Sequence, residues 1–212
     1  MQLDDLAQRA LGLCRASDTE TRVVLGIAGS PGSGKTTLAT AVVDRVNELA
    51  GICTAVHLPM DGFHLANSAL DALGRRARKG AIDTFDGWGY VAMLRRLAAE
   101  RDHTVYAPGF DRTIDEPVAG QIAVAPDARL VVTKGNYLLV DDPPWSLARP
   151  LFAETWFCAT PAAERSRRLV ARHQQFGRTL AEARHWADEV DGANAALIEP
   201  TAARASITVD DF

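Results

Sequence analysis

Apolar residues alternate along the chain between helical spacing and short, continuous runs. Apolar side chains recur every three or four positions over residues 3–14, which predicts an amphipathic helix. Residues 23–28 are almost wholly apolar, as is typical of a strand covered on both faces. A second amphipathic helix is predicted over residues 38–49, ending near Gly51. The opening part of the chain therefore indicates helices packed on a buried sheet.

The same alternation continues to the end of the chain. Further apolar runs predict strands at residues 54–58, 129–133, 154–158 and 206–209, and an apolar face predicts a helix over residues 90–98. Helix starts are predicted at Ser68 with Asp71 and at Thr179 with Glu182, both capping-box pairs, and at Thr160 before Pro161. Prolines and glycines in residues 104–126 favour a loop or a short β excursion. The prediction is an α/β fold with a doubly wound, mainly parallel sheet in three layers.

Three predicted loops follow predicted strands, at residues 29–36, 59–65 and 133–137. In parallel sheets ligands bind beyond the carboxyl ends of the strands. We therefore expect these loops to share one crevice.

Composition limits the function classes. A length of 212 residues predicts a single domain, and the formal net charge of -4 argues against a general nucleic-acid binder. The acidic start of the chain and the lack of a long apolar run predict no signal peptide and no membrane partner, hence a cytoplasmic protein. Cys14, Cys53 and Cys158 are widely spaced and predict free, buried thiols. Oligomeric state cannot be predicted from the sequence, and a homodimer stays open.

Residues Gly29–Thr36 (Gly-Ser-Pro-Gly-Ser-Gly-Lys-Thr) match the phosphate-binding loop G-x-x-x-x-G-K-[ST] between a predicted strand and a predicted helix. Glycines let backbone N–H groups surround phosphate oxygens at the start of a helix. Lys35 should reach the β and γ phosphates, and the Thr36 hydroxyl should bind Mg²⁺. The predicted nucleotide-binding residues here are Gly29, Ser30, Pro31, Gly32, Ser33, Gly34, Lys35, Thr36 and Thr37. The pattern predicts ATP and Mg²⁺ as cofactors of a P-loop fold.

A GTPase is the first alternative. Residues Asp86–Gly89 satisfy D-x-x-G, but this short pattern is common by chance, and the chain contains no N-K-x-D guanine-reading motif. The sequence therefore favours ATP.

Two further segments carry candidate chemistry. Asp61 follows the strand at residues 54–58, where a carboxylate could accept a proton from a substrate hydroxyl, although a turn-forming aspartate is an equal alternative. Arg165, Arg168 and Arg172 share one predicted helix face before a break at Gly177. Such arginines suit a lid that clamps phosphate charge, predicted at about residues 173–185, although a solvated basic face fits the pattern alone.

Together these segments resemble the phosphoribulokinase, uridine kinase and pantothenate kinase family of P-loop kinases. The resemblance is closest to its bacterial nucleoside/nucleotide kinase-like branch, in which some members are labelled fructose transport system kinases. It covers the chain from Val23 to about Arg204 and includes, beyond the phosphate loop, residues 60–64, 78–80, 83–86, 106–112, 135–138 and the arginine-rich lid.

The resemblance implies roles for individual residues. Asp61 matches the family's catalytic aspartate, and Arg172 and Arg178 match lid arginines that contact ATP phosphates. The implied acceptor-binding residues are Asp61, His64, Arg78, Lys79, Asp83, Asp86, Phe110 and Arg112, with Asp111 in the same segment. The expected catalytic set is Asp61, Lys35 and Arg172.

Lys134 departs from the family pattern, which usually has glutamate at this position. The acidic residue helps to organise the metal, so a lysine puts catalysis in doubt. Alternatively, Lys134 turns to solvent or to a neighbouring carboxylate, or contacts phosphate itself. We expect it to emerge at the carboxyl end of its strand.

The function predicted from the sequence is ATP-dependent transfer of the γ-phosphoryl group to a hydroxyl of a small metabolite, such as a sugar, a nucleoside or a pantothenate-like alcohol. The alternatives are a nucleotide-binding regulator with little or no kinase activity and an ATPase that drives a conformational change.

Overall fold

A computed structural model of the chain describes residues 1–17, 21–51 and 54–210. Its helices are α1 (Leu3–Ala16), α2 (Lys35–Ala50), α3 (Asn67–Ala72), α4 (Gly87–Ala99), α5 (Ala162–Gln175), α6 (Leu180–Trp186) and α7 (Gly192–Ile198). Its strands are β1 (Val23–Ala28), β2 (Ala55–Pro59), β3 (Val105–Asp111), β4 (Glu116–Val124), β5 (Leu130–Gly135), β6 (Glu154–Ala159) and β7 (Ile207–Asp210). Short helical turns are η1 (Met60–Phe63), η2 (Arg76–Arg78), η3 (Ile82–Thr84), η4 (Trp145–Leu147), η5 (Arg149–Leu151), the π-helical η6 (Ala187–Asp191) and η7 (Glu199–Arg204).

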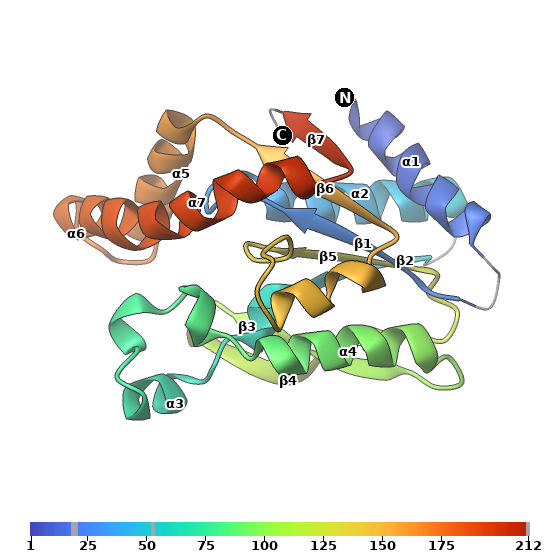
Figure 1. The fold of residues 1–212 in the computed structure, drawn as a ribbon, viewed down its shortest axis with the longest axis horizontal. Helices are drawn as coiled ribbons and strands as arrows, with labels where there is room; N and C mark the ends of the chain where they lie inside the picture. Colours follow the sequence, from blue (N-terminus) through green and yellow to red (C-terminus); the bar gives the residue numbers. More distant parts are fainter. Residues whose placement is uncertain (18–20, 52–53, 211–212) are drawn as a thin grey trace.

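Five strands form one sheet in the order β2-β5-β1-β6-β7, and every neighbouring pair is parallel. Strands β1 and β5 are buried along their whole length, as their apolar sequences require. Figure 1 shows α4 on one side of this sheet and α1 and α2 on the other. The predicted doubly wound α/β architecture is confirmed.

Alternate residues of the strands lie on opposite faces of the sheet and pack into two separate cores. Leu25 and Trp156 pack with Leu38 and Val42 of α2, and with the apolar face of α1. Val24 and Phe157, which are adjacent in sequence to Leu25 and Trp156, pack on the opposite face with Leu94 of α4. Because both faces of β1 and β5 are covered, the centre of the sheet is a firm support for the loops at its carboxyl edge.

The segment at residues 104–126 forms an antiparallel hairpin of β3 and β4, so the β alternative is confirmed. The hairpin packs beside η1, where a Cβ at Gly62 would lie 2.2 Å from the backbone oxygen of Pro108. Gly62 therefore permits the hairpin to approach the end of β2.

Several predicted ends of helices are confirmed. Gly51 ends α2 in the left-handed region with φ 71°, and Thr179 and Glu182 form the capping box of α6. The predicted last strand is present as β7. Cys14 and Cys158 are buried free thiols, and Cys53 lies outside the described residues.

Two predicted helix starts are wrong. Helix α3 begins at Asn67 without a side-chain cap from Ser68, and the Asn67 N–H donates to the Glu116 carboxylate at 3.0 Å. Helix α5 begins at Ala162 with Pro161 as N-cap, while the Thr160 hydroxyl donates to the backbone oxygen of Ser33 at 3.1 Å. In both places a contact distant in sequence replaces the local cap.

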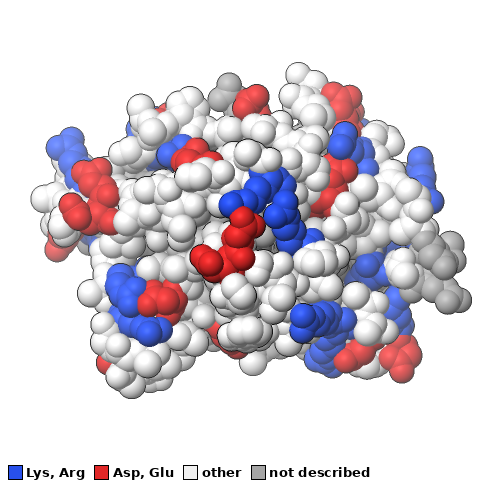
Figure 2. All heavy atoms as spheres, in the orientation of Figure 1, with Lys and Arg blue, Asp and Glu red and all other residues white. Residues whose placement is uncertain are grey.

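Charged side chains of both signs lie close together at several places on the face shown in Figure 2. Ion pairs such as Arg78 with Asp83 and Arg96 with Glu100 account for part of this mixing. No helix within the described ranges is long and apolar enough to cross a membrane.

Candidate active site

The phosphate loop (Gly29–Thr36) joins β1 to α2, and its path depends on glycine. Gly29 has φ 148°, and a Cβ there would lie 2.7 Å from the backbone oxygen of Cys158. Gly32 has φ 78°, and a Cβ there would lie 2.8 Å from the backbone oxygen of Arg165. The loop can therefore pass close to β6 and α5 only because these positions lack side chains.

Lys35, the first residue of α2, is buried with its ammonium turned into the phosphate loop. Its Nζ donates to the backbone oxygen of Ser30 at 2.6 Å and lies 3.4 Å from the Ser33 hydroxyl. Burial and the nearby ammonium of Lys134 lower the pKa of Lys35 to about 7. The helix N-terminus and this lysine together favour an anion.

Side chains distant in sequence brace the phosphate loop. The Ser30 hydroxyl donates to the Glu199 carboxylate, and Arg165 of α5 forms an ion pair with the same carboxylate at 3.0 Å. The loop is thereby connected both to η7 and to the arginine-rich helix. No sequence pattern marked Glu199, because its partner lies 169 residues away.

Asp61 lies in η1, directly after β2, and its carboxylate accepts a hydrogen bond from the Lys134 ammonium at 2.5 Å. Lys134 is the penultimate residue of β5, at the carboxyl end of the strand as expected, and it is buried. Of the open alternatives for Lys134, the structure shows contact with a neighbouring carboxylate. The carboxyl ends of β2 and β5 therefore bring Asp61 and Lys134 together.

The ion pair sets the charge of Asp61. Burial alone would raise the pKa of the Asp61 carboxyl, but the Lys134 ammonium outweighs this effect and holds the pKa below its usual value. His64 and Arg112 act in the same direction, and the Arg112 guanidinium lies 3.5 Å from the Asp61 carboxylate. Asp61 is therefore ionised throughout the neutral range.

An aromatic group lines the side of the site formed by the β3–β4 hairpin. The His64 ring lies 4.0 Å from the Phe85 ring and 4.8 Å from the Phe110 ring, measured between centroids. His64 Nδ1 lies 2.8 Å from the backbone oxygen of Asp61 and must donate, because a carbonyl only accepts. Burial lowers the pKa of His64, so the neutral ring keeps Nε2 as an acceptor.

The predicted basic residues of this region are engaged with acidic ones. Lys79 contacts Asp115 at 2.9 Å and lies 5.1 Å from the centre of the Phe110 ring, while Arg78 forms a bidentate pair with Asp83. These contacts connect residues 78–83 to the hairpin and to each other.

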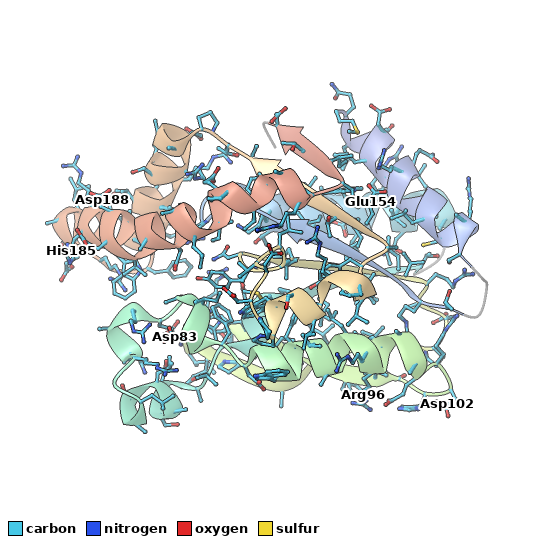
Figure 3. The ribbon with its side chains drawn as sticks, in the orientation of Figure 1. Asp83, Arg96, Asp102, Glu154, His185 and Asp188 are labelled. Carbon is cyan, nitrogen blue, oxygen red and sulfur yellow. The ribbon has the colours of Figure 1, made fainter. Side chains whose placement is uncertain are left out.

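Asp86, predicted as an acceptor-binding residue, caps a helix. Its side chain accepts the Gly89 N–H at 2.7 Å and caps α4. A second support nearby was not predicted: Tyr137 and Asn194 both donate to the backbone oxygen of Gly80, at 2.6 and 3.2 Å. Figure 3 shows Asp83 on this segment, below the α6 region that carries His185 and Asp188.

The two lid arginines differ in position. Arg172 lies in the last turn of α5, where burial chiefly lowers its pKa and the charges of Asp191, Arg112 and Asp61 also act on it. Arg178 lies over the Trp186 ring of α6 at 3.7 Å. The charge of Arg172 therefore acts on Asp61, whereas Arg178 contacts α6.

Asp191 is another residue that sequence reasoning missed. It ends η6 and contacts His173 of α5 at 2.8 Å. A π-helical turn is a weak signal in any sequence, although such turns are frequent at functional sites.

Side chains fit Mg²⁺ poorly here. Thr36 is exposed in the first turn of α2 and can offer a hydroxyl, but Asp61 is paired with an ammonium. Among the described residues, no group of three His, Cys, Asp or Glu side chains is arranged to hold a metal ion. Within the described ranges, a Mg²⁺ ion would therefore find the Thr36 hydroxyl but no cluster of carboxylates.

Two cavities lie next to these elements. One of about 330 Å³ lies beyond the carboxyl ends of β6 and β7 and is lined by Ala159, Thr160, Pro161, Glu199 and Asp210. A larger one, about 590 Å³, lies between α5 and the α6–η6 segment and is lined by residues other than the predicted site residues. The region of Lys35, Lys134 and Asp61 is the candidate active site, because the size of a cavity alone does not indicate a reaction.

No family model matches the chain. Over 202 residues the chain is 35% identical to a Schizosaccharomyces pombe protein named "Putative uridine kinase C227.14", covering 92% of this chain and 85% of that protein. It is 34% identical over 203 residues to the uncharacterized protein YggC of Escherichia coli, covering 94% and 82%. A solved structure described as a "putative fructose transport system kinase" from Silicibacter sp. TM1040 superposes with a TM-score of 0.89 at 34% identity, covering 99% of each chain.

These similarities extend over almost the whole chain, and they agree with a phosphate loop at the carboxyl edge of a parallel sheet. The chain belongs to the phosphoribulokinase, uridine kinase and pantothenate kinase family of P-loop kinases.

Proposed function

We propose that the chain is an ATP-dependent kinase that transfers the γ-phosphoryl group to a hydroxyl of a small metabolite. The observation that carries the proposal is the position of Asp61. Its partly buried carboxylate follows β2, is bonded to Lys134 of β5, and lies close enough to Lys35 to affect the pKa of that lysine. A proton acceptor therefore lies beside the phosphate loop, as transfer between two bound molecules requires.

The proposed step uses Asp61, Lys35 and Arg172. The acceptor hydroxyl oxygen bonds to the γ-phosphorus while the bond from that phosphorus to the β–γ bridging oxygen breaks, and ADP leaves. The hydroxyl proton passes to the Asp61 carboxylate. Lys35 and Arg172 stabilise the charge that moves onto the phosphate oxygens.

Nucleotide would be held by residues 29–37, with Arg172 and Arg178 closing from the lid at about residues 173–185. A Mg²⁺ ion that arrives with ATP would find the Thr36 hydroxyl as its protein ligand and would neutralise phosphate charge. No step proposed here depends on that ion. We also propose that residues 1–212 act as one domain in the cytoplasm.

The acceptor would lie between η1 and the β3–β4 hairpin, against the residues His64, Arg78, Lys79, Asp83, Asp86, Phe110 and Arg112. His64 Nε2 can accept a hydrogen bond from a second hydroxyl, and the rings of Phe85 and Phe110 give an apolar wall. Sugars, nucleosides and pantothenate-like alcohols all offer this combination of hydroxyl and apolar surface.

A coupled ADP-release screen across sugars, nucleosides and vitamin precursors tests the proposal. We expect release only with one acceptor class, and mass spectrometry should find the phosphorylated acceptor. ADP release that is independent of every acceptor would instead identify an ATPase.

The Asp61–Lys134 ion pair favours a second candidate, a nucleotide-binding regulator. A carboxylate held by an ammonium is a weaker base than a free one. Tight ATP binding without ADP release in the same screen would support this candidate.

A further inference from the structure

Lys134 lies midway between the two halves of the site. In the sheet register it is opposite Ile27 of β1, two residues before Gly29, and opposite Pro59 of β2, two residues before Asp61. An ammonium on β5 is therefore between the phosphate loop and the proposed base.

The site holds more positive than negative charge. Lys35, Lys134, Arg112 and Arg172 all interact electrostatically with the carboxylate of Asp61, and Asp191 also acts on Arg172. The Lys134 side chain is only 6% exposed, so water does little to offset its charge. Lys35 and Lys134 are both buried, and a further anion beside them would offset the positive charge that Asp61 alone leaves.

We propose that the Lys134 ammonium is the resident cation of the transfer site, shared between the Asp61 carboxylate and the terminal phosphate of bound nucleotide, so that nucleotide binding depends on Lys134 more than on a divalent metal. The inference rests on the proposed function, because it assumes nucleotide at the phosphate loop. It accounts for the poor fit of the side chains to Mg²⁺: Lys134 supplies positive charge where a metal would otherwise do so.

The chemistry of lysine permits this sharing. An ammonium has three donor hydrogens, and Lys134 uses one on Asp61 in the observed geometry. A phosphate oxygen can accept another without breaking the ion pair. Bound nucleotide then shares the positive charge of Lys134, so less of that charge acts on Asp61. The Asp61 carboxylate therefore becomes a better proton acceptor when the phosphoryl donor is bound.

The competing explanation is that Lys134 only neutralises Asp61. A thermodynamic cycle separates the two, because each predicts a different result for the double variant. ATP affinity is measured by calorimetry, in EDTA and with Mg²⁺, for wild type, Lys134→Met, Asp61→Asn and the double variant. Arg45→Met removes a charge that pairs with Asp4 and Glu48 on the surface and serves as the control.

In EDTA we expect Lys134→Met to weaken ATP binding by at least about tenfold, the loss typical of one hydrogen bond to a charged group. Asp61→Asn should strengthen binding in EDTA, because Lys134 loses its competing partner. The double variant should bind as weakly as Lys134→Met alone. Added Mg²⁺ should improve wild-type affinity less than it improves that of Lys134→Met.

Recovery of wild-type affinity in the double variant would overturn the inference, since Lys134 would then act only through Asp61. Unchanged affinity in Lys134→Met would overturn it as well. If Lys134→Met does not fold, Asp61→Asn alone tests the inference. Unchanged ATP affinity of this variant in EDTA would show that Asp61 and phosphate do not share the Lys134 ammonium. Failure of the kinase proposal is seen separately, as ATP binding without ADP release.

Discussion

The phosphate loop and the acceptor side of the site are built in different ways. The phosphate loop is a contiguous stretch of backbone whose glycines and helix start are defined within eight residues, and a rigid, fully buried strand precedes it. The acceptor side is assembled from side-chain contacts between distant segments, such as Lys79 with Asp115 and Asn67 with Glu116. The proposed nucleotide site is therefore encoded locally, whereas the proposed acceptor site depends on how three segments pack.

The difference also appears in burial. Lys35 and Lys134 are buried, but the Arg78 and Arg112 side chains are about half exposed. Exposed ion pairs contribute little to stability and can exchange partners. We therefore expect substitutions on the proposed acceptor side to leave the phosphate loop intact.

The largest expected effect is on the phosphate loop. Lys35→Ala should abolish detectable ATP binding and turnover, because the ammonium is lost from the loop and Lys134, which also holds Asp61, cannot replace its charge there. Calorimetry and ADP release would be measured together. Unchanged values for both would show that nucleotide binds elsewhere.

Asp61→Asn should lower turnover by at least about 10²-fold, the contribution typical of a general base. Affinity for ATP in the presence of Mg²⁺ should change little, because asparagine keeps the size of the side chain. Steady-state kinetics with the acceptor from the screen would measure both. Full activity would limit Asp61 to a structural role.

His57 of β2 should make the free energy of unfolding depend on pH. Burial, together with the Lys134 ammonium, lowers its pKa from 6.5 to about 4, so the unfolded chain binds a proton before the folded one does. The free energy of unfolding should fall as pH drops from about 6.5 to 4, by about 2 kcal/mol after allowance for partial exposure.

Urea unfolding at several pH values would measure this loss, with His57→Gln as the comparison. The variant should lose that part of the pH dependence. An identical pH profile in both proteins would assign the acid sensitivity to other groups.

On the acceptor side, Lys79→Met should raise the KM for the acceptor by about tenfold while leaving ATP affinity unchanged, because Lys79 contacts Asp115 and Phe110 rather than the phosphate loop. Arg76→Met, which removes a surface ion pair with Asp71, is the matched control. If Lys79→Met weakened ATP binding as much as it raised the KM for the acceptor, the phosphate loop and the acceptor side would not be independent.

The smallest expected effect is in the lid. Amide exchange in residues 173–185 should slow when an ATP analogue is added, as Arg178 leaves the Trp186 ring for phosphate. Trp186 fluorescence should change at the same time, and Arg178→Ala should remove the exchange difference. Identical exchange with and without nucleotide would describe a fixed basic helix.

The sequence alone determined the phosphate loop, the parallel strands, the end of α2 at Gly51 and the start of α6 at Thr179, because each depends on a short local pattern. It also placed Asp61 beside the loop through strand order and family resemblance. The predicted caps at Ser68 and Thr160 were wrong, since Glu116 and Ser33 offered better partners across the fold.

Only the tertiary structure decided the partner of Lys134, the brace from Glu199 to Ser30, and the position of Arg172. These contacts join residues that are tens of positions or more apart, so no local sequence pattern predicts them. A buried charge selects its partner by distance in the folded chain, because the energy of an ion pair falls with separation and rises as water is excluded. Which carboxylate meets the ammonium is therefore fixed by how the strands align.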